Sequence, residues 1–204
     1  MNIFYINESP ALAAQELCNI HVNKMALETA QMLSTAHRLS GRTVKCTSSK
    51  LFREFAKPGD EARELKKPKE FSICTDLGEY QNPFDLTIHL TIYRETHQNH
   101  PSTKWVRSSS GAYKWAWMLF KELCREYHYR TGKVTTMAKL IETLAPIPEN
   151  LNEEDWTDPP LCMPDEYKSE DHVEAYRKYY ISKQDSMKVP MVWTGGSQKP
   201  EWFA

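Results

Sequence analysis

The sequence predicts a mainly α-helical single domain with long irregular excursions. Residues 17–37 and 110–130 carry apolar side chains at spacings of three and four, which is the period of an amphipathic helix. The 204 residues are 40% hydrophobic and 26% charged, an ordinary composition for a soluble globular protein with one core. We therefore expect residues 1–204 to form one domain in which these two helices pack together.

The N-terminal part is predicted to contain a short apolar segment followed by helices. Residues 1–6 are mostly apolar, and the Asn-Glu-Ser turn after them can cap a helix that begins near Pro10. The next helix covers 17–37 and should stop near Gly41, because glycine favours the left-handed conformation that ends many helices.

Residues 42–95 are predicted to form a basic, loop-rich insertion. Their lysines and arginines are interleaved with acidic residues and interrupted by Pro and Gly, which favours a solvated loop over a surface that grips nucleic acid. Within this insertion, 51–56 fit a short helix. Residues 84–93 fit either a strand or a helix, and the helical context favours the helix.

The C-terminal half should begin with the helix over 110–130, followed by a short helix over 136–144. Prolines and acidic residues indicate an extended segment over 146–165 that lies on the surface. Helical spacing returns over 169–184, where acidic residues come early and basic residues late, as the helix dipole prefers. An irregular, aromatic tail ends the chain.

Composition and motifs exclude several classes of protein. The formal net charge is −1, so nucleic-acid binding would depend on a local basic patch. No apolar run is long enough to cross a membrane, and we expect no leader peptide. The five cysteines form no CxxC pair and the seven histidines no convincing zinc spacing. We therefore expect free thiols in the cytoplasm, no metal and no cofactor.

A narrow polar strip runs along the predicted helix over 17–37. At about 100° per residue, five side chains fall on one line: His21, Lys24, Glu28, Gln31 and Thr35. Lys24 and Glu28 are the only fully charged residues of the helix. The strip either lines a cleft or is a solvated face whose ion pair adds roughly 0.2–0.5 kcal/mol.

Glu28 is the strongest candidate for a general acid or base. Apolar surroundings favour its protonated form, whereas the neighbouring Lys24 favours the carboxylate. These opposed effects suit a group that exchanges protons, and His21 is a second candidate for proton transfer.

A second polar cluster precedes the helix over 110–130. Arginine, hydroxyl groups and the free N–H groups of a helix N-terminus can together hold a phosphate. The residues proposed for this anion site are Asn99, His100, Arg107, Ser108 and Ser109. In the ordinary alternative, Ser109 or Ser110 caps the helix, Arg107 pairs with an acid, and 99–101 form a tight turn.

Three features of the chain resemble the pyrimidine-dimer DNA glycosylase (endonuclease V-type) family in its broad, phage-type sense. They are the opening MNIF, the helix with Lys24 and Glu28, and the NHPSTKWVR stretch at 99–107 before a long aromatic helix. The resemblance covers about residues 1–40 and 97–130. It implies a helical protein that acts on DNA through an N-terminal α-amine nucleophile and a helix glutamate, here Glu28.

The leading hypothesis is a DNA glycosylase or glycosylase/lyase that acts on a damaged or modified base. We expect Glu28, Lys24 and His21 to face Asn99, His100 and Arg107 across a cleft. In this arrangement Glu28 is the acid/base, Arg107 with Ser108 and Ser109 holds a phosphate, and Trp105 or Tyr113 supports a displaced base.

Two other hypotheses stay open. The first is an enzyme that acts on free nucleotides at the same anion site, which the near-neutral charge supports. The second is a non-catalytic, phage-type factor that binds a host protein through 42–80 and 146–164. Substituting Glu28 by Gln would discriminate between them, because unchanged activity in cells with a folded variant would exclude both enzymes.

Overall fold

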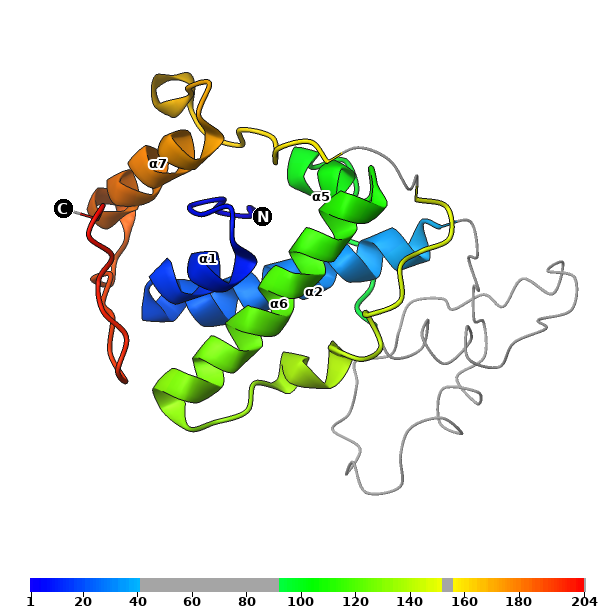
Figure 1. Cartoon of the computed structure of the whole chain (residues 1–204), viewed down its shortest axis with the longest axis horizontal. Coiled ribbons are helices and arrows are strands. Elements are labelled where there is room, and N and C mark those ends of the chain that lie inside the picture. Colours follow the sequence, from blue (N-terminus) through cyan, green and yellow to red (C-terminus); the bar gives the residue numbers. More distant parts are fainter. Residues whose placement is uncertain (41–91, 152–155, 204) are drawn as a thin grey trace, which may run out of the picture.

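The computed structural model describes residues 1–40, 92–151 and 156–203. This part of the chain holds five α-helices, two 3-10 helices and no strand, so the prediction of a mainly α-helical protein is confirmed (Figure 1). The elements are α1 (Pro10–Glu16), α2 (Asn19–Arg38), α5 (Pro101–Val106), α6 (Ser110–Thr131), η1 (Thr136–Leu140), η2 (Asp165–Tyr167) and α7 (His172–Ser186). Most of the insertion predicted at 42–95, including 51–56 and 84–91, lies outside the described residues.

Helices α1 and α2 begin where the sequence predicts them. The Ser9 hydroxyl accepts a hydrogen bond from the Leu12 N–H, and Pro10 occupies the first turn, where its missing N–H costs nothing. Leu17 and Cys18 have extended backbones and separate the two helices. The helix predicted over 17–37 therefore starts two residues later, at Asn19.

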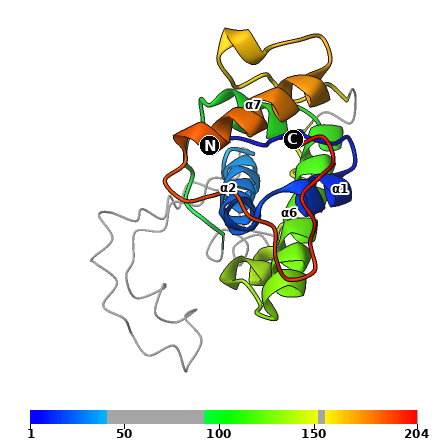
Figure 2. The same cartoon turned by 90° about the vertical axis from the view of Figure 1, so that its left-hand side faces the viewer.

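Helix α2 lies at the centre of the described structure and packs against α6 (Figures 1 and 2). Twelve of its residues are buried, including Met25, Ala26 and Leu33. On α6 the side chains at spacings of three and four, such as Ala116 and Phe120, are likewise buried. The predicted pairing of these two helices is confirmed, because their apolar stripes face one another.

Helix α5 was not predicted. The expected turn at 99–101 continues into a six-residue helix, since Pro101 pre-sets the first turn and the His100 side chain caps it. Trp105 and Val106 of this short helix are buried against the core. An isolated helix of this length is unstable in water, and burial against the core stabilises α5.

The elements after α6 differ from prediction mainly in length. The helix expected over 136–144 is the shorter 3-10 helix η1, followed by turns up to Leu144. Residues 156–164 contain no helix, as expected for the proline-rich segment. Helix α7 begins at His172 because the Asp171 carboxylate accepts the Glu174 N–H.

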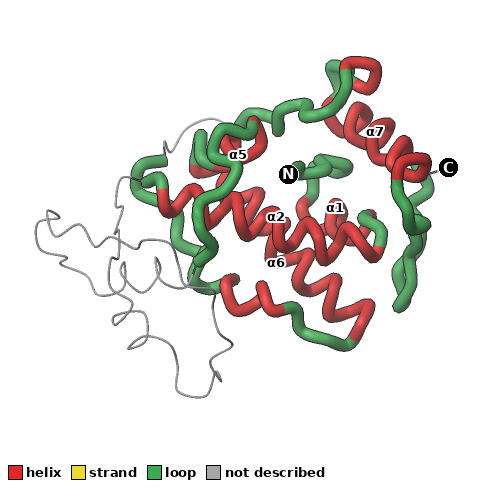
Figure 3. The backbone as a smooth tube through the Cα atoms, turned by 180° about the vertical axis from the view of Figure 1, so that it is seen from behind, coloured by secondary structure: helices red, strands yellow, loops and turns green. Residues whose placement is uncertain are grey.

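The C-terminal tail runs back over the start of α2 (Figures 1 and 3). The Asn19 N–H donates to the Val192 carbonyl at 2.9 Å, and the Trp193 indole donates to the Glu16 carbonyl at 3.0 Å. Phe203 is buried beside Tyr180 of α7. The tail thus joins α1, α2 and α7. No helix in the described ranges is long and apolar enough to span a membrane.

Replacing Gly195 by alanine is expected to destabilise the protein more than replacing Gly132. Both glycines have a left-handed backbone, with φ of +69° and +66°, so either substitution should cost about 1–2 kcal/mol. A Cβ at Gly195 would also collide with the Arg130 carbonyl oxygen, whereas a Cβ at Gly132 meets nothing within 4 Å. Urea unfolding should show an additional loss of about 1–3 kcal/mol for Gly195→Ala. Equal losses would contradict this packing.

Candidate functional site

Glu28 is the centre of the candidate site. Its side chain is 16% exposed, and its Oε2 accepts the backbone N–H of Asn2 at 3.0 Å. The same oxygen lies 3.9 Å from the α-amine of Met1, while Oε1 lies 3.8 Å from the Nζ of Lys24. Two basic nitrogens and one amide N–H therefore surround one partly shielded carboxylate.

The apolar N-terminal segment places Met1 beside Glu28. Residues 3–6 are all buried, so the chain enters the core directly after Asn2. The Met1 side chain is 2% exposed, and its sulfur lies 3.3 Å from the Thr103 hydroxyl of α5. Figures 1 and 3 show the N-terminus in the middle of the molecule, between α7 and α2.

His100 lies within electrostatic range of this group. Burial lowers the pKa of His100, and the positive charges of the Met1 amine and His97 lower it further, whereas Glu28 opposes them. Its Nδ1 accepts the Ser102 N–H at 3.2 Å as the cap of α5. A neutral ring that accepts at Nδ1 carries its proton on Nε2, so His100 offers a hydrogen-bond donor there.

The groups of the predicted anion site already have partners within the chain. The Ser109 hydroxyl caps α6 by accepting the Ala112 N–H, which confirms the ordinary alternative for this residue. Arg107 donates to the Gln98 carbonyl at 2.8 Å, and Ser108 donates to the Trp105 carbonyl at 2.7 Å. Arg107 therefore bonds a carbonyl rather than the acid that the alternative suggested. Phosphate binding by these groups stays a prediction.

Three candidate residues lie in the core. His21 is 4% exposed, with its Nδ1 2.8 Å from the Tyr180 hydroxyl. Tyr113 is fully buried and donates to the Leu144 carbonyl, and Trp105 is 5% exposed and donates to the Thr157 carbonyl. These positions suit packing better than contact with a displaced base. Gln31 is half-buried and Asn99 is exposed.

The structure thus brings together part of the predicted site. Glu28 and Lys24 form an ion pair, and His100 lies near them, as the expected cleft requires. No contact among the described residues joins Glu28 to Arg107. Within the same part of the chain, no group of three or more His, Cys, Asp or Glu residues is arranged to hold a metal ion.

Comparisons with known proteins return nothing for this chain. No family model, curated protein or solved structure matches it.

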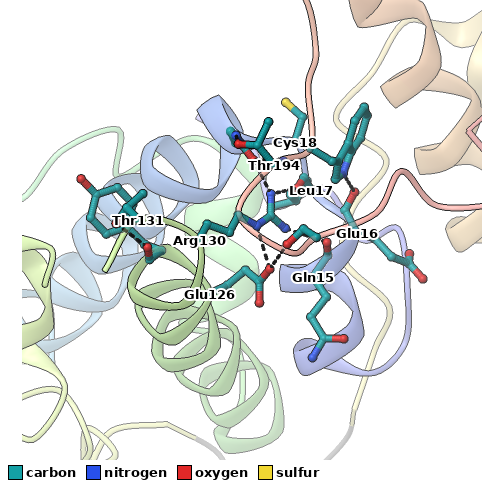
Figure 4. Close-up of polar contacts among 12 residues, drawn as sticks. Gln15, Glu16, Leu17, Cys18, Glu126, Arg130, Thr131 and Thr194 are labelled. Atoms are coloured by element: carbon teal, nitrogen blue, oxygen red, sulfur yellow. Dashed lines mark hydrogen bonds and ion pairs between the residues drawn. The ribbon is translucent and has the colours of Figure 1, made fainter. Parts of the chain in front are cut away.

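The residue patterns alone did not point to two groups of polar residues. The first is the Met1 amine with Asn2: the family resemblance implies an N-terminal amine, but only the apolar run that follows Asn2 indicated that this end of the chain enters the core. The second is a polar network around the buried side chain of Arg130 on α6, shown in Figure 4. The Arg130 guanidinium pairs with Glu126 at 2.7 Å and donates to the carbonyls of Gln15 and Leu17 at 2.8 Å each. In the sequence, this network was indicated only by the i,i+4 spacing of Glu126 and Arg130 on one helix.

His21 is expected to make the protein less stable in mild acid. Burial, aided by the positive charges of Lys24 and Lys183, lowers the pKa of His21 from 6.5 to about 4. As the pH falls below 6.5, the unfolded chain takes up a proton that the folded protein refuses until about pH 4. Because of His21, the free energy of unfolding should therefore fall by about 3 kcal/mol as the pH is lowered from 6.5 to about 4.

Urea unfolding as a function of pH measures this effect. The variant His21→Phe should have a flatter pH dependence than the wild type between pH 6.5 and pH 4. Tyr180→Phe is the matched control, because it removes the hydroxyl beside His21 but keeps the imidazole. An identical slope in the wild type and His21→Phe would contradict the assignment.

Proposed function

We propose that this protein is a DNA base-processing enzyme, a glycosylase or glycosylase/lyase that acts on a damaged or modified base. The observation that carries the proposal is the 3.9 Å separation between the Met1 α-amine and Glu28 Oε2. An amine beside a shielded carboxylate is the pair that the family resemblance implies, and it is a sound arrangement for nucleophilic attack at a sugar carbon.

In the proposed reaction, the unprotonated Met1 amine attacks C1′ of the target nucleotide. A bond forms between nitrogen and C1′ while the glycosidic bond breaks, and the electron pair leaves with the base, which takes up a proton. Glu28 accepts the proton that the amine loses and stabilises the positive charge on the sugar. Opening of the sugar ring then gives a Schiff base, and loss of a C2′ proton allows elimination of the 3′ phosphate.

Lys24 and His100 would assist at either side of this pair. Lys24 is 56% exposed, so its ammonium group can contact a DNA phosphate while it pairs with Glu28. His100 can donate from Nε2 to the sugar or the departing base. These two residues and Glu28 form the core of the proposed substrate site.

The free thiols of Cys18, Cys124 and Cys162 suit a reducing compartment, and we propose the cytoplasm.

Borohydride trapping tests the proposal. The protein is incubated with duplexes that each carry one modified base, then reduced and analysed for a covalent adduct. The expected result is an adduct whose modified peptide begins at Met1. Base release without an adduct would indicate a glycosylase that uses water, and an absence of product and binding would count against DNA as the substrate.

A free-nucleotide enzyme is the second candidate, and the formal net charge of −1 favours it. The two functions differ in their response to salt. Binding to duplex DNA through several phosphates should weaken steeply as salt rises, whereas binding to a mononucleotide should change less. If the protein is instead a non-catalytic factor that binds a host protein, it should bind neither duplex DNA nor a mononucleotide.

A further inference from the structure

Asn2 uses its backbone and both ends of its side chain in hydrogen bonds. Its backbone N–H donates to Glu28 Oε2 at 3.0 Å. Its side-chain Oδ1 accepts the Ile3 N–H at 2.8 Å, and its Nδ2 donates to the Cys162 carbonyl at 3.2 Å. One residue therefore connects α2, the N-terminal segment and the segment at 156–164.

The two ends of the Asn2 amide cannot be exchanged. The Ile3 N–H is a donor and needs the amide oxygen, whereas the Cys162 carbonyl is an acceptor and needs the NH2 group. Aspartate could not replace this residue, since it has no donor for Cys162 and would bring a second carboxylate near Glu28. The orientation of the side chain is fixed by its surroundings.

The partner of the side chain is itself firmly held. The Cys162 N–H donates to the Pro160 carbonyl at 2.8 Å, and the hydroxyl of Tyr176 on α7 donates to the same carbonyl at 2.6 Å. His172 of α7 lies 3.0 Å from the Pro159 carbonyl oxygen through its Nδ1. Asn2 is thus anchored to a segment that α7 supports.

Fixing Asn2 also fixes the residue before it. The peptide bond between Met1 and Asn2 is planar, so a fixed Asn2 N–H leaves few directions for the Met1 Cα and its amine. The buried Met1 side chain removes further freedom. A reacting amine benefits from such restriction, because misplacement by about 1 Å can cost a hundredfold in rate.

We infer that Asn2 is a positioning residue, which holds the α-amine of Met1 against Glu28 by tying the N-terminal segment to the Cys162 carbonyl. This inference rests on the proposed function, because it assigns to Asn2 the geometry of the proposed nucleophile. The residue need not touch DNA.

The test compares three variants in borohydride trapping with a duplex that carries one abasic site. The abasic sugar presents an aldehyde, so the probe does not depend on which base is removed. Asn2→Leu keeps the approximate size and removes both side-chain hydrogen bonds, and Asn2→Gln keeps the amide one methylene farther out. Both residues are bulky enough that Met1 should be retained, which is checked by intact mass.

Asn7→Leu is the matched control. Asn7 is also half-buried in the N-terminal segment, and its amide accepts the Ser9 N–H and donates to Glu16 at 3.0 Å each. Asn7→Leu therefore removes the same kinds of hydrogen bond as Asn2→Leu, but at a residue that does not contact Glu28. The two leucine variants should have similar melting temperatures.

Asn2→Leu is expected to form the Met1 adduct about ten to a hundred times more slowly than the wild type. Its affinity for the DNA should change less than about twofold, since binding depends mainly on phosphate contacts. Asn7→Leu should react at the wild-type rate, and Asn2→Gln should recover part of the loss. This result would mean that Asn2→Leu reacts slowly because its amine is misplaced, and not because the protein is less stable.

Two failures can be told apart. If the wild type forms a Met1 adduct and Asn2→Leu forms it equally fast, or no slower than Asn7→Leu, the positioning role is overturned and the proposed function stands. If the wild type forms no adduct at Met1, the amine mechanism fails and the role of Asn2 fails with it.

Discussion

Replacing Arg130 by methionine is expected to lower the free energy of unfolding by about 3–5 kcal/mol. The Arg130 side chain is 2% exposed and donates to the Glu126 carboxylate, to Asn19 Oδ1, and to the carbonyls of Gln15 and Leu17. Methionine has a similar length but no donor. The carbonyls of Gln15 and Leu17 at the end of α1 and the largely buried Glu126 carboxylate would lose this partner, and leaving shielded acceptors unsatisfied is costly.

Urea unfolding with Arg125→Met as the control isolates this effect. Arg125 lies on the same helix and pairs with Glu122 at 3.0 Å, but its side chain is 70% exposed. Exposed pairs contribute about 0.2–1 kcal/mol, so this control should change stability little. Arg130→Lys keeps the charge and should lose part of the stability, because one ammonium group cannot reproduce the planar fork. A loss below about 1 kcal/mol for Arg130→Met would contradict the network.

Glu28→Gln is expected to lower the rate of base release or adduct formation by about 100–10,000-fold. Glutamine can still accept the Asn2 N–H through its amide oxygen, so the N-terminal segment should keep its place. It can neither accept the proton of the attacking amine nor stabilise a positively charged sugar. The rate is measured under single-turnover conditions, which separate chemistry from product release.

Glu122→Gln provides the control for this variant. The Glu122 side chain is 14% exposed, close to the 16% of Glu28, and it also pairs with a basic residue on its own helix. Its substitution should leave the rate unchanged. If Glu28→Gln and Glu122→Gln react alike, Glu28 has no role in the chemistry.

Periodicity predicted the two central helices because each carries its apolar residues on a single face. Helix α2 is buried along most of its length, so the two charges at Lys24 and Glu28 stood out and marked the part of the site that the structure brings together. Local rules also gave Ser9 and Ser109 as caps. These features depend only on residues that are near one another in the sequence.

The rest of the site depends on tertiary contacts that no local pattern contains. Met1 meets Glu28 because the segment at 3–6 is buried in the core and holds the N-terminus against α2. Tyr113 and Trp105 looked like surface aromatics for a displaced base, but the same residue types at the same spacings serve equally well as core residues. His21 belongs to the polar strip by angle, and yet Tyr180 of α7 covers it.

The position of Met1 also bears on the order of events during synthesis. Met1 ends in an environment built from Thr103 and the segment around Cys162, which are translated much later than Met1 itself. Contacts between residues so far apart in the chain form slowly, since the intervening loops must close first. The Met1 amine therefore stays outside its final setting until the segment around Cys162 has emerged from the ribosome. A ribosome-bound chain that ends before Cys162 should hold an amine that is chemically present but not yet placed for reaction.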